Sequence, residues 1–288
     1  MRFVSYNIQY GKGRDGRFDL ERIARAVDGA DVIAMQEVER FYKRSGLADQ
    51  PAELARLLPA YHWVFGPGLD LDAGVAGGDE RLIHRRRQFG NLLLSRTPIL
   101  SARNHLLPKF GTLTQFSLQR AALEGVVATP SGVIRVYSIH LTHLSDDTRQ
   151  PQVERILDIH ARAPIEGGAW CGEHDEGWTE GQPPPVMPRE AILMGDFNLT
   201  PDSPLYARLA GPWSPAYGRM NGLEGFVDAW VAGGRRESEG ITCPDVHGGK
   251  RIDYCFVSSR IAARVRRAWI DERADGSDHH PIWTEIDL

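Results

Sequence analysis

The chain has 288 residues, of which 42% are hydrophobic and 25% charged, so it has enough apolar residues for a large buried core. Its 34 basic and 38 acidic residues give a formal net charge of −4, which argues against an overall positive field for long stretches of nucleic acid backbone. The three cysteines, Cys171, Cys243 and Cys255, lack a CxxC spacing, and this argues against a disulfide framework or a structural zinc site.

The N-terminal residues, MRFVSYNIQYG, enter a strand pattern at once and lack the charged and apolar segments of a signal peptide. No apolar run is long enough to cross a bilayer. We therefore expect a cytoplasmic protein without integral membrane association, and a monomer. Length alone allows two domains, but no linker separates two cores. The sequence thus predicts one domain over residues 1–288, with a long loop insertion at about 164–189.

The first segment of the chain has the pattern strand, helix, strand. Residues 2–8 alternate and contain β-branched and aromatic side chains, and this strand ends at Asn7. Residues 19–27 have apolar side chains at helical spacing. A buried strand at 31–35 then leads to Glu37. The pattern indicates a crossover connection with a polar group at the end of each strand.

The next segment combines a helix, a strand and a polar stretch. Residues 51–58 predict an amphipathic helix, and 61–65 predict an aromatic strand. Residues 69–87 are rich in Gly, Asp and Arg and show no periodicity, so we expect a surface loop there. Three consecutive arginines at 85–87 form the one obvious basic patch, for which a solvated loop is the favoured interpretation.

The middle of the chain predicts antiparallel strands. Residues 120–128 and 132–139 flank a Pro-Ser-Gly turn, and the second strand ends at His140. A helix is predicted at 150–161. Because tight turns imply antiparallel pairing whereas the first segment implies a crossover, the fold class is mixed α/β.

The segment 164–189 has no periodicity and contains three consecutive prolines. A loop of that length inside a domain is either disordered or functional. Trp170 and Trp178 favour a functional loop, and the segment directly precedes the apolar run at 192–194. We therefore expect the two tryptophans to lie on a mobile loop over the active-site cleft.

Residues 192–204, ILMGDFNLTPDSP, carry the strongest local signal for function. The apolar run predicts a buried strand, and Gly195 interrupts it just before Asp196 and Asn198. A strand followed by an ordinary Asp/Asn/Pro turn explains this stretch equally well when it is taken alone. The functional interpretation is preferred because other strands of the chain also end in polar groups.

The polar groups at strand ends are mostly carboxylates, amides and imidazoles. Acidic and amide oxygens without a thiolate suit a hard cation such as Mg²⁺ or Mn²⁺. Imidazole titrates near neutrality and could supply proton transfer. Together these groups suggest hydrolysis of a phosphate ester. The candidate residues are Asn7, Glu37, His140, Asp196, Asn198, Asp253, Asp278 and His279.

Six motifs occur in a fixed order along the chain: SYNIQYG, MQEVE, SIHLTH, GDFNLTPDSP, KRIDYCFVS and SDHHPI. This series resembles the endonuclease/exonuclease/phosphatase superfamily, which has the DNase I-like fold. The resemblance extends from the first strand to the last. It implies a four-layer α/β/β/α sandwich, with two mostly antiparallel sheets face to face, helices outside, and the active site at one edge of the sheets.

The resemblance also implies roles for the candidate residues. Glu37 would be the principal metal carboxylate, with Asn7 and Asp278 near the same ion, which would be Mg²⁺ with Mn²⁺ or Ca²⁺ as substitutes. His279, oriented by Asp253, would be the general base or would polarise the phosphate. Asp196 and Asn198 would position the attacking water and a phosphate oxygen. His140 would stabilise the pentacoordinate state.

The resemblance leaves the substrate open. Phosphodiesters are favoured because both imidazoles are present, and the partner could be a small molecule, a lipid head group or nucleic acid. A nuclease acting on DNA or RNA is the first alternative. A non-catalytic binding module is the second, and it would require the loss of a catalytic group, which the sequence does not show. His143 and His280 are not assigned a role, and His143 is interpreted as structural.

Overall fold

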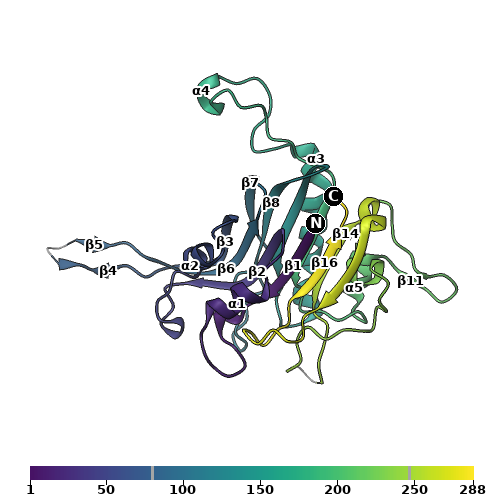
Figure 1. The fold of residues 1–288 in the computed structure, drawn as a ribbon, viewed down its shortest axis with the longest axis horizontal. Helices are drawn as coiled ribbons and strands as arrows, with labels where there is room; N and C mark the ends of the chain where they lie inside the picture. The colour runs from purple at the N-terminus through teal and green to yellow at the C-terminus, as the bar shows by residue number, and fades with distance from the viewer. Residues whose placement is uncertain (79–80, 246–247) are drawn as a thin grey trace.

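Two six-stranded sheets pack face to face in the computed structural model, which describes residues 1–78, 81–245 and 248–288 (Figure 1). The first sheet has the strand order β15 (Val265–Ile270), β16 (Ile282–Ile286), β1 (Arg2–Asn7), β2 (Val32–Arg40), β6 (Arg86–Ser95), β3 (His62–Asp72). The second has the order β13 (Phe226–Asp228), β14 (Asp253–Ser258), β10 (Ala191–Asp196), β9 (Gly132–His140), β8 (Ala121–Thr129), β7 (Ile99–Leu106).

Helices and short ribbons complete the described fold. The helices are α1 (Leu20–Ala26), α2 (Gln50–Leu57), α3 (Asp146–Glu166), α4 (Glu176–Thr179), α5 (Pro204–Ala210) and α6 (Ala229–Ala232), with the 3₁₀ turns η1 (Gln9–Gly11), η2 (Lys43–Ser45) and η4 (Ser259–Arg264). Two small ribbons pair β4 (Val75–Ala76) with β5 (Leu82–Ile83) and β11 (Trp213–Ser214) with β12 (Gly218–Arg219).

The central strands are apolar on both faces because both faces are buried. In β1, Phe3 packs between the two sheets, whereas the next residue, Val4, packs under α1 and α2. In β10, Ile192 points between the sheets and Leu193 points toward α3 and α5. This period of two explains the continuous apolar runs in the sequence. The predicted four-layer α/β/β/α architecture is confirmed.

The helices α1 and α2 follow the sequence signals, whereas α3 is longer than predicted and α4 lies in the segment that was expected to be a loop. The helix α1 begins after Asp19, whose carboxylate accepts hydrogen bonds from the backbone of the first turn. The helix α3 is longer than the predicted 150–161, because Ser145 and Thr148 form a capping box that starts it four residues earlier.

The expectation of a surface loop at residues 69–87 is wrong. The strands β3 and β6 continue into this stretch and pair as far as Asp72 with Arg86, and the small ribbon of β4 and β5 extends them. The result is a long hairpin that projects from the sheet, at the left of Figure 1. The polar, glycine-rich composition misled the prediction because a two-stranded projection has no buried face and therefore shows no apolar alternation.

The expectation that the segment 164–189 covers the cleft is also wrong. The segment leaves the C-terminal end of α3 and returns to the start of β10, and Figure 1 shows α4 projecting there. Ala191 pairs with Arg135 near the start of β9, whereas Asp196 pairs with His140 at its end. The segment therefore lies at the end of the second sheet opposite to the GDFN motif.

No helix among the described residues is long and apolar enough to cross a membrane.

Candidate active site

Four of the sequence-predicted residues lie at strand ends that meet at one edge of the sandwich. Asn7 ends β1, His140 ends β9 and Asp196 ends β10. Asp253 begins the antiparallel strand β14, and it pairs in register with Asp196. The parallel pairing of β9 and β10 also places His140 opposite Asp196. The topology therefore brings residues far apart in sequence to one place.

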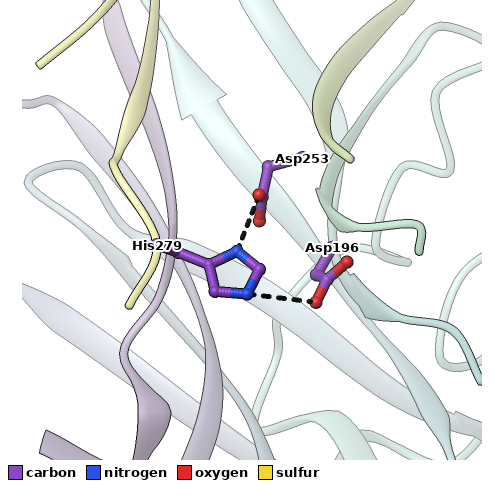
Figure 2. Close-up of side chains that lie close together, drawn as sticks. All are labelled: Asp196, Asp253 and His279. Atoms are coloured by element: carbon purple, nitrogen blue, oxygen red, sulfur yellow. Dashed lines mark hydrogen bonds and ion pairs between the residues drawn. The ribbon is translucent and has the colours of Figure 1, made fainter. Parts of the chain in front are cut away.

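His279 lies between two carboxylates, as Figure 2 shows. Its Nδ1 is 2.8 Å from Oδ2 of Asp253, and its Nε2 is 3.9 Å from Oδ2 of Asp196. Burial disfavours the imidazolium, but the charge and the hydrogen bond of Asp253 outweigh it and raise the pKa of His279 well above its ordinary value. The ring therefore favours the charged form, with a proton on the Nδ1 that faces Asp253.

Two carboxylates share the side chain of Asn7. Its Nδ2 donates to Oε1 of Glu37 at 3.3 Å and to Oδ2 of Asp196 at 3.0 Å. Burial raises the pKa of both acids, that of Asp196 to about 7 with a further contribution from Asp253. Arg120 and His279 offset part of this negative charge, and a bound cation would further stabilise the ionised form of both acids.

Glu37 does not end a strand as the sequence suggested, but lies in the middle of β2. The register of β2 against β6 shifts between Met35 and Val38, which marks a β-bulge, and Glu37 adopts the left-handed backbone conformation with φ 59°. Bulges re-aim side chains next to active sites. A non-glycine residue in this region is held there at a cost of about 1–3 kcal/mol. The bulge turns Glu37 toward Asn7.

Arg120 is a site residue that the sequence analysis missed. It is buried, and its Nη1 donates to Nδ1 of His140 at 2.9 Å. Burial and the charge of Arg120 lower the pKa of His140 well below its ordinary value. The neutral ring therefore carries its proton on Nε2, which faces Asp196 at 3.4 Å and Glu37 at 3.9 Å. Arg120 also contacts Nδ1 of His143, which lies at the rim.

Gln9 is a second residue that the sequence analysis missed. Its Nε2 donates to Oδ2 of Asp278 at 2.7 Å, and its backbone is left-handed with φ 42°. Ser277 links the same loop to the first strand, because its hydroxyl donates to the carbonyl oxygen of Asn7 at 2.7 Å. The charge of Asp278 contributes to the raised pKa of Glu37, so the two carboxylates lie near each other.

The structure separates the remaining candidates by their contacts. The Nδ2 of Asn198 donates to the carbonyl oxygen of Leu141 at 3.1 Å, and its backbone N–H donates to Oδ1 of Asp196 at 2.9 Å. Asn198 therefore holds the ends of β9 and β10 together and orients Asp196. The backbone of His280 donates to the carbonyl oxygen of Thr242, and burial lowers the pKa of its ring.

The donor set fits a hard divalent cation. Asp196, Asp253 and His279 offer ligand atoms that lie within 4.8 Å of one another. However, the imidazolium form that Asp253 favours for His279 carries a proton on both ring nitrogens and so has no lone pair for a cation, and in this form the three groups fit proton handling better. The carboxylates of Glu37 and Asp278, with the amide of Asn7 beside them, are the oxygen donors that Mg²⁺ prefers.

The sequence profile described as Endonuclease/Exonuclease/phosphatase family matches residues 4–279 of the chain. The chain belongs to this family. Members of the family hydrolyse phosphate esters, so the protein is assigned to the phosphoesterase class of hydrolases. No curated protein matches the sequence.

Solved structures with the same fold have low sequence identity. An endonuclease/exonuclease/phosphatase from Beutenbergia cavernae is 22% identical over 100% of this chain and 71% of its own, with a TM-score of 0.70. A mannosyl-6-phosphatase from Bacteroides thetaiotaomicron is 17% identical over 100% of both chains, with a TM-score of 0.62. The 3′ phosphatase NExo from Neisseria, bound to a product DNA hairpin, is 18% identical over 100% of both chains, with a TM-score of 0.56.

Proposed function

We propose that this protein is a divalent-metal-dependent phosphoesterase that favours phosphodiesters and uses in-line attack by water. The observation that carries the proposal is the position of His279, which lies between Asp253 and Asp196 beside the Glu37 and Asn7 pair. An oriented imidazolium and a carboxylate with a pKa near neutrality are the groups that acid–base hydrolysis at neutral pH requires.

The carboxylates of Glu37 and Asp278, with Asn7 between Glu37 and Asp196, would hold the cation. Mg²⁺ suits these oxygen donors, and Mn²⁺ or Ca²⁺ could replace it. When bound, the ion supplies Lewis-acid stabilisation of the charge that develops on the phosphoryl group. The raised pKa values of Glu37 and Asp196 support this assignment, because burial and the neighbouring carboxylates Asp278 and Asp253 disfavour the ionised acids, and a cation would favour them.

The protein's own groups divide the remaining chemistry among them. Asp196, with a pKa of about 7, accepts a proton from the attacking water while the water oxygen forms its bond to phosphorus. His279 and His140 each direct Nε2 toward Asp196, and they donate hydrogen bonds to the phosphoryl oxygens as negative charge develops on them. The bond from phosphorus to the leaving oxygen breaks as that oxygen takes a proton from the His279 imidazolium, and Asp196 then returns its proton to His279. Asp253 orients the charged ring of His279, and Arg120 fixes the tautomer of the neutral His140 ring.

A nuclease on DNA or RNA is the alternative within the same fold. The Neisseria structure binds a DNA hairpin, but at 18% identity it supports the fold alone. The net charge of −4 favours small or short substrates over long duplexes. A non-catalytic binding module is disfavoured, because the described residues include all eight groups named from the sequence.

A panel of substrates tests the proposal. We would assay bis-p-nitrophenyl phosphate, a p-nitrophenyl monoester, supercoiled DNA, short RNA and sphingomyelin, each with Mg²⁺ and with EDTA. The proposal expects the diester to be hydrolysed faster than the monoester, with loss of activity in EDTA and recovery when Mg²⁺ is restored. Faster hydrolysis of the monoester, or unchanged turnover in EDTA, would contradict it.

A further inference from the structure

A cavity of about 260 Å³ adjoins the proposed catalytic groups and has aromatic walls. Glu37 and Arg120 form the side shared with the active site. The rings that line it are those of Tyr10, Tyr42, Phe89 and Phe116, and we call this cavity the aromatic pocket. A larger hollow of about 1020 Å³ lies between α3 and α5, but none of its described lining residues belongs to the active site.

Arg44 holds the aromatic pocket in shape. Its guanidinium carbon lies 3.8 Å from the ring centroid of Tyr10 and 4.7 Å from that of Tyr42. Its Nε and Nη2 bind the buried carboxylate of Glu39 at 2.9 and 2.5 Å. A guanidinium fixed to a buried acid and stacked on two rings loses little freedom when a ligand binds. The Tyr10 and Tyr42 walls of the pocket are therefore held in place before the substrate arrives.

Tyr10 is held by an unusual backbone conformation. It lies in the left-handed region with φ 47°, and its carbonyl oxygen accepts a hydrogen bond from Nε2 of Gln50 at 2.6 Å. Gln9, the residue before it, binds Asp278 in the active site. Strained backbone that the surrounding structure maintains is a mark of functional sites. The loop that positions Asp278 thus also positions one wall of the aromatic pocket.

We propose that the aromatic pocket binds a nucleobase of the substrate, attached through its sugar to the phosphate that is cleaved. This inference rests on the proposed phosphoesterase activity. Flat aromatic side chains and guanidinium planes are the surfaces on which unstacked bases pack. The volume of about 260 Å³ is below the roughly 300–1,000 Å³ of pockets for drug-sized ligands, so it suits a single ring system.

The charged residues around the aromatic pocket disfavour a cationic head group there. Aromatic cages bind quaternary ammonium groups through their ring faces. Here the guanidinium of Arg44 already occupies faces of Tyr10 and Tyr42, and Arg120 adds a second positive charge at the side of Glu37. A choline-like cation would meet these two positive charges against the single carboxylate of Glu37 among the described lining residues. A bare sugar has no flat face to stack on the aromatic rings of the pocket.

Phe116 offers a way to test the pocket without altering catalytic groups. It lines the pocket from the irregular stretch between β7 and β8, and its side chain is 74% exposed. Phe110 lies in the same stretch, is 60% exposed and does not line the pocket. Replacement of either ring should leave the fold intact, because exposed side chains contribute little to the core. The pair therefore provides a variant and its matched control.

The test measures competitive inhibition of methyl p-nitrophenyl phosphate hydrolysis by the Mg²⁺-loaded enzyme. The inhibitors are adenosine 5′-monophosphate, ribose 5-phosphate and phosphocholine, of which the first two differ only by the base. We expect the nucleotide to bind about 5- to 150-fold more tightly than ribose 5-phosphate, the range that corresponds to stacking of one base. Phe116→Ala and Tyr42→Ala should remove most of this difference, and Phe110→Ala should preserve it.

Equal inhibition by the nucleotide and ribose 5-phosphate would overturn the inference. Phosphocholine as the tightest-binding of the three inhibitors would also overturn it. So would a Phe110→Ala variant that reduces nucleotide binding as much as Phe116→Ala does. Failure of the proposed function is a separate result. If the enzyme hydrolyses no chromogenic ester with Mg²⁺, Mn²⁺ or Ca²⁺, the activity is refuted, and calorimetric titration of the same ligands still shows whether the base adds affinity.

Discussion

The Nδ1 of His279 lies 2.8 Å from Oδ2 of Asp253, and both side chains are buried. The second oxygen of Asp253, Oδ1, is buried without a partner among the described residues, so the imidazole is the main compensation for this carboxylate. Asp253 is stabilised mainly by His279, and Asp253 in turn keeps the proton on His279. The two side chains therefore form a functional unit.

Because the two side chains act together, their replacements should not be additive. His279→Ala and Asp253→Asn should each lower metal-saturated kcat by as much as ~10⁴-fold, by analogy with measured triads. The double variant should be little worse than either single variant. The measurement is kcat for all three proteins, with circular dichroism as a check of folding. Losses that multiply would show that the two residues act independently.

His160 should make part of the folding stability sensitive to acid. Arg135 donates to its Nδ1 at 3.0 Å, and burial together with this charge lowers the pKa of His160 to about 4. The folded state thus favours the neutral ring. The contribution of the neutral His160 ring to the free energy of unfolding, on the order of 2–3 kcal/mol, is fully present above pH 6.5 and is lost as the pH falls toward 4.

The measurement for His160 is the free energy of unfolding by urea at pH 7, 6, 5 and 4. His160→Gln keeps an acceptor for Arg135 but does not titrate, so its stability should fall less over this range than that of the wild type. The same slope in both proteins would mean that other groups cause the acid sensitivity.

The segment between α3 and β10 should be dispensable for catalysis. Gly168 and Pro185 lie so close that a Cβ on Gly168 would be 2.0 Å from the carbonyl oxygen of Pro185. Arg103 holds the base of the segment by donating to the carbonyl oxygens of Gly167 and Gly168. Replacement of residues 169–184 by two glycines should leave kcat/KM within about twofold, because the segment lies far from the active site. A folded deletion variant with a tenfold loss would show that the segment contacts the substrate.

The sequence predicted the residues whose neighbours form regular strands. Asn7, His140 and Asp196 each end a stretch with a strand pattern, and a predicted strand that ends in a polar group is visible without the structure. The parallel pairs β1 with β2 and β9 with β10 then bring these ends together.

The residues that the sequence did not predict depend on contacts across the fold. Arg120 precedes an apolar strand and has no local pattern, and its role arises from its contact with His140 in the neighbouring strand. Gln9 becomes a site residue through Asp278, which is 269 positions away. The left-handed backbone of Glu37 arises from a bulge whose register only the partner strand β6 defines.

The central claim is that Glu37 binds the cation that the reaction requires. Glu37→Gln should lower kcat/KM for bis-p-nitrophenyl phosphate by more than about 100-fold. Replacing a residue that only orients a metal ligand already lowers metal affinity or activity by up to about that factor. The exposed Glu53→Gln on α2 is the control.

The most direct measurement is a Mg²⁺ titration of the melting temperature of wild-type, Glu37→Gln and Glu53→Gln proteins, followed by turnover at saturation. A cation at 100 times its Kd should raise the wild-type Tm by about 5 °C. We expect this rise and Mg²⁺-dependent turnover in the wild type and in Glu53→Gln, and the loss of both in Glu37→Gln. A Glu37→Gln protein with the wild-type Tm rise and wild-type turnover would contradict the account.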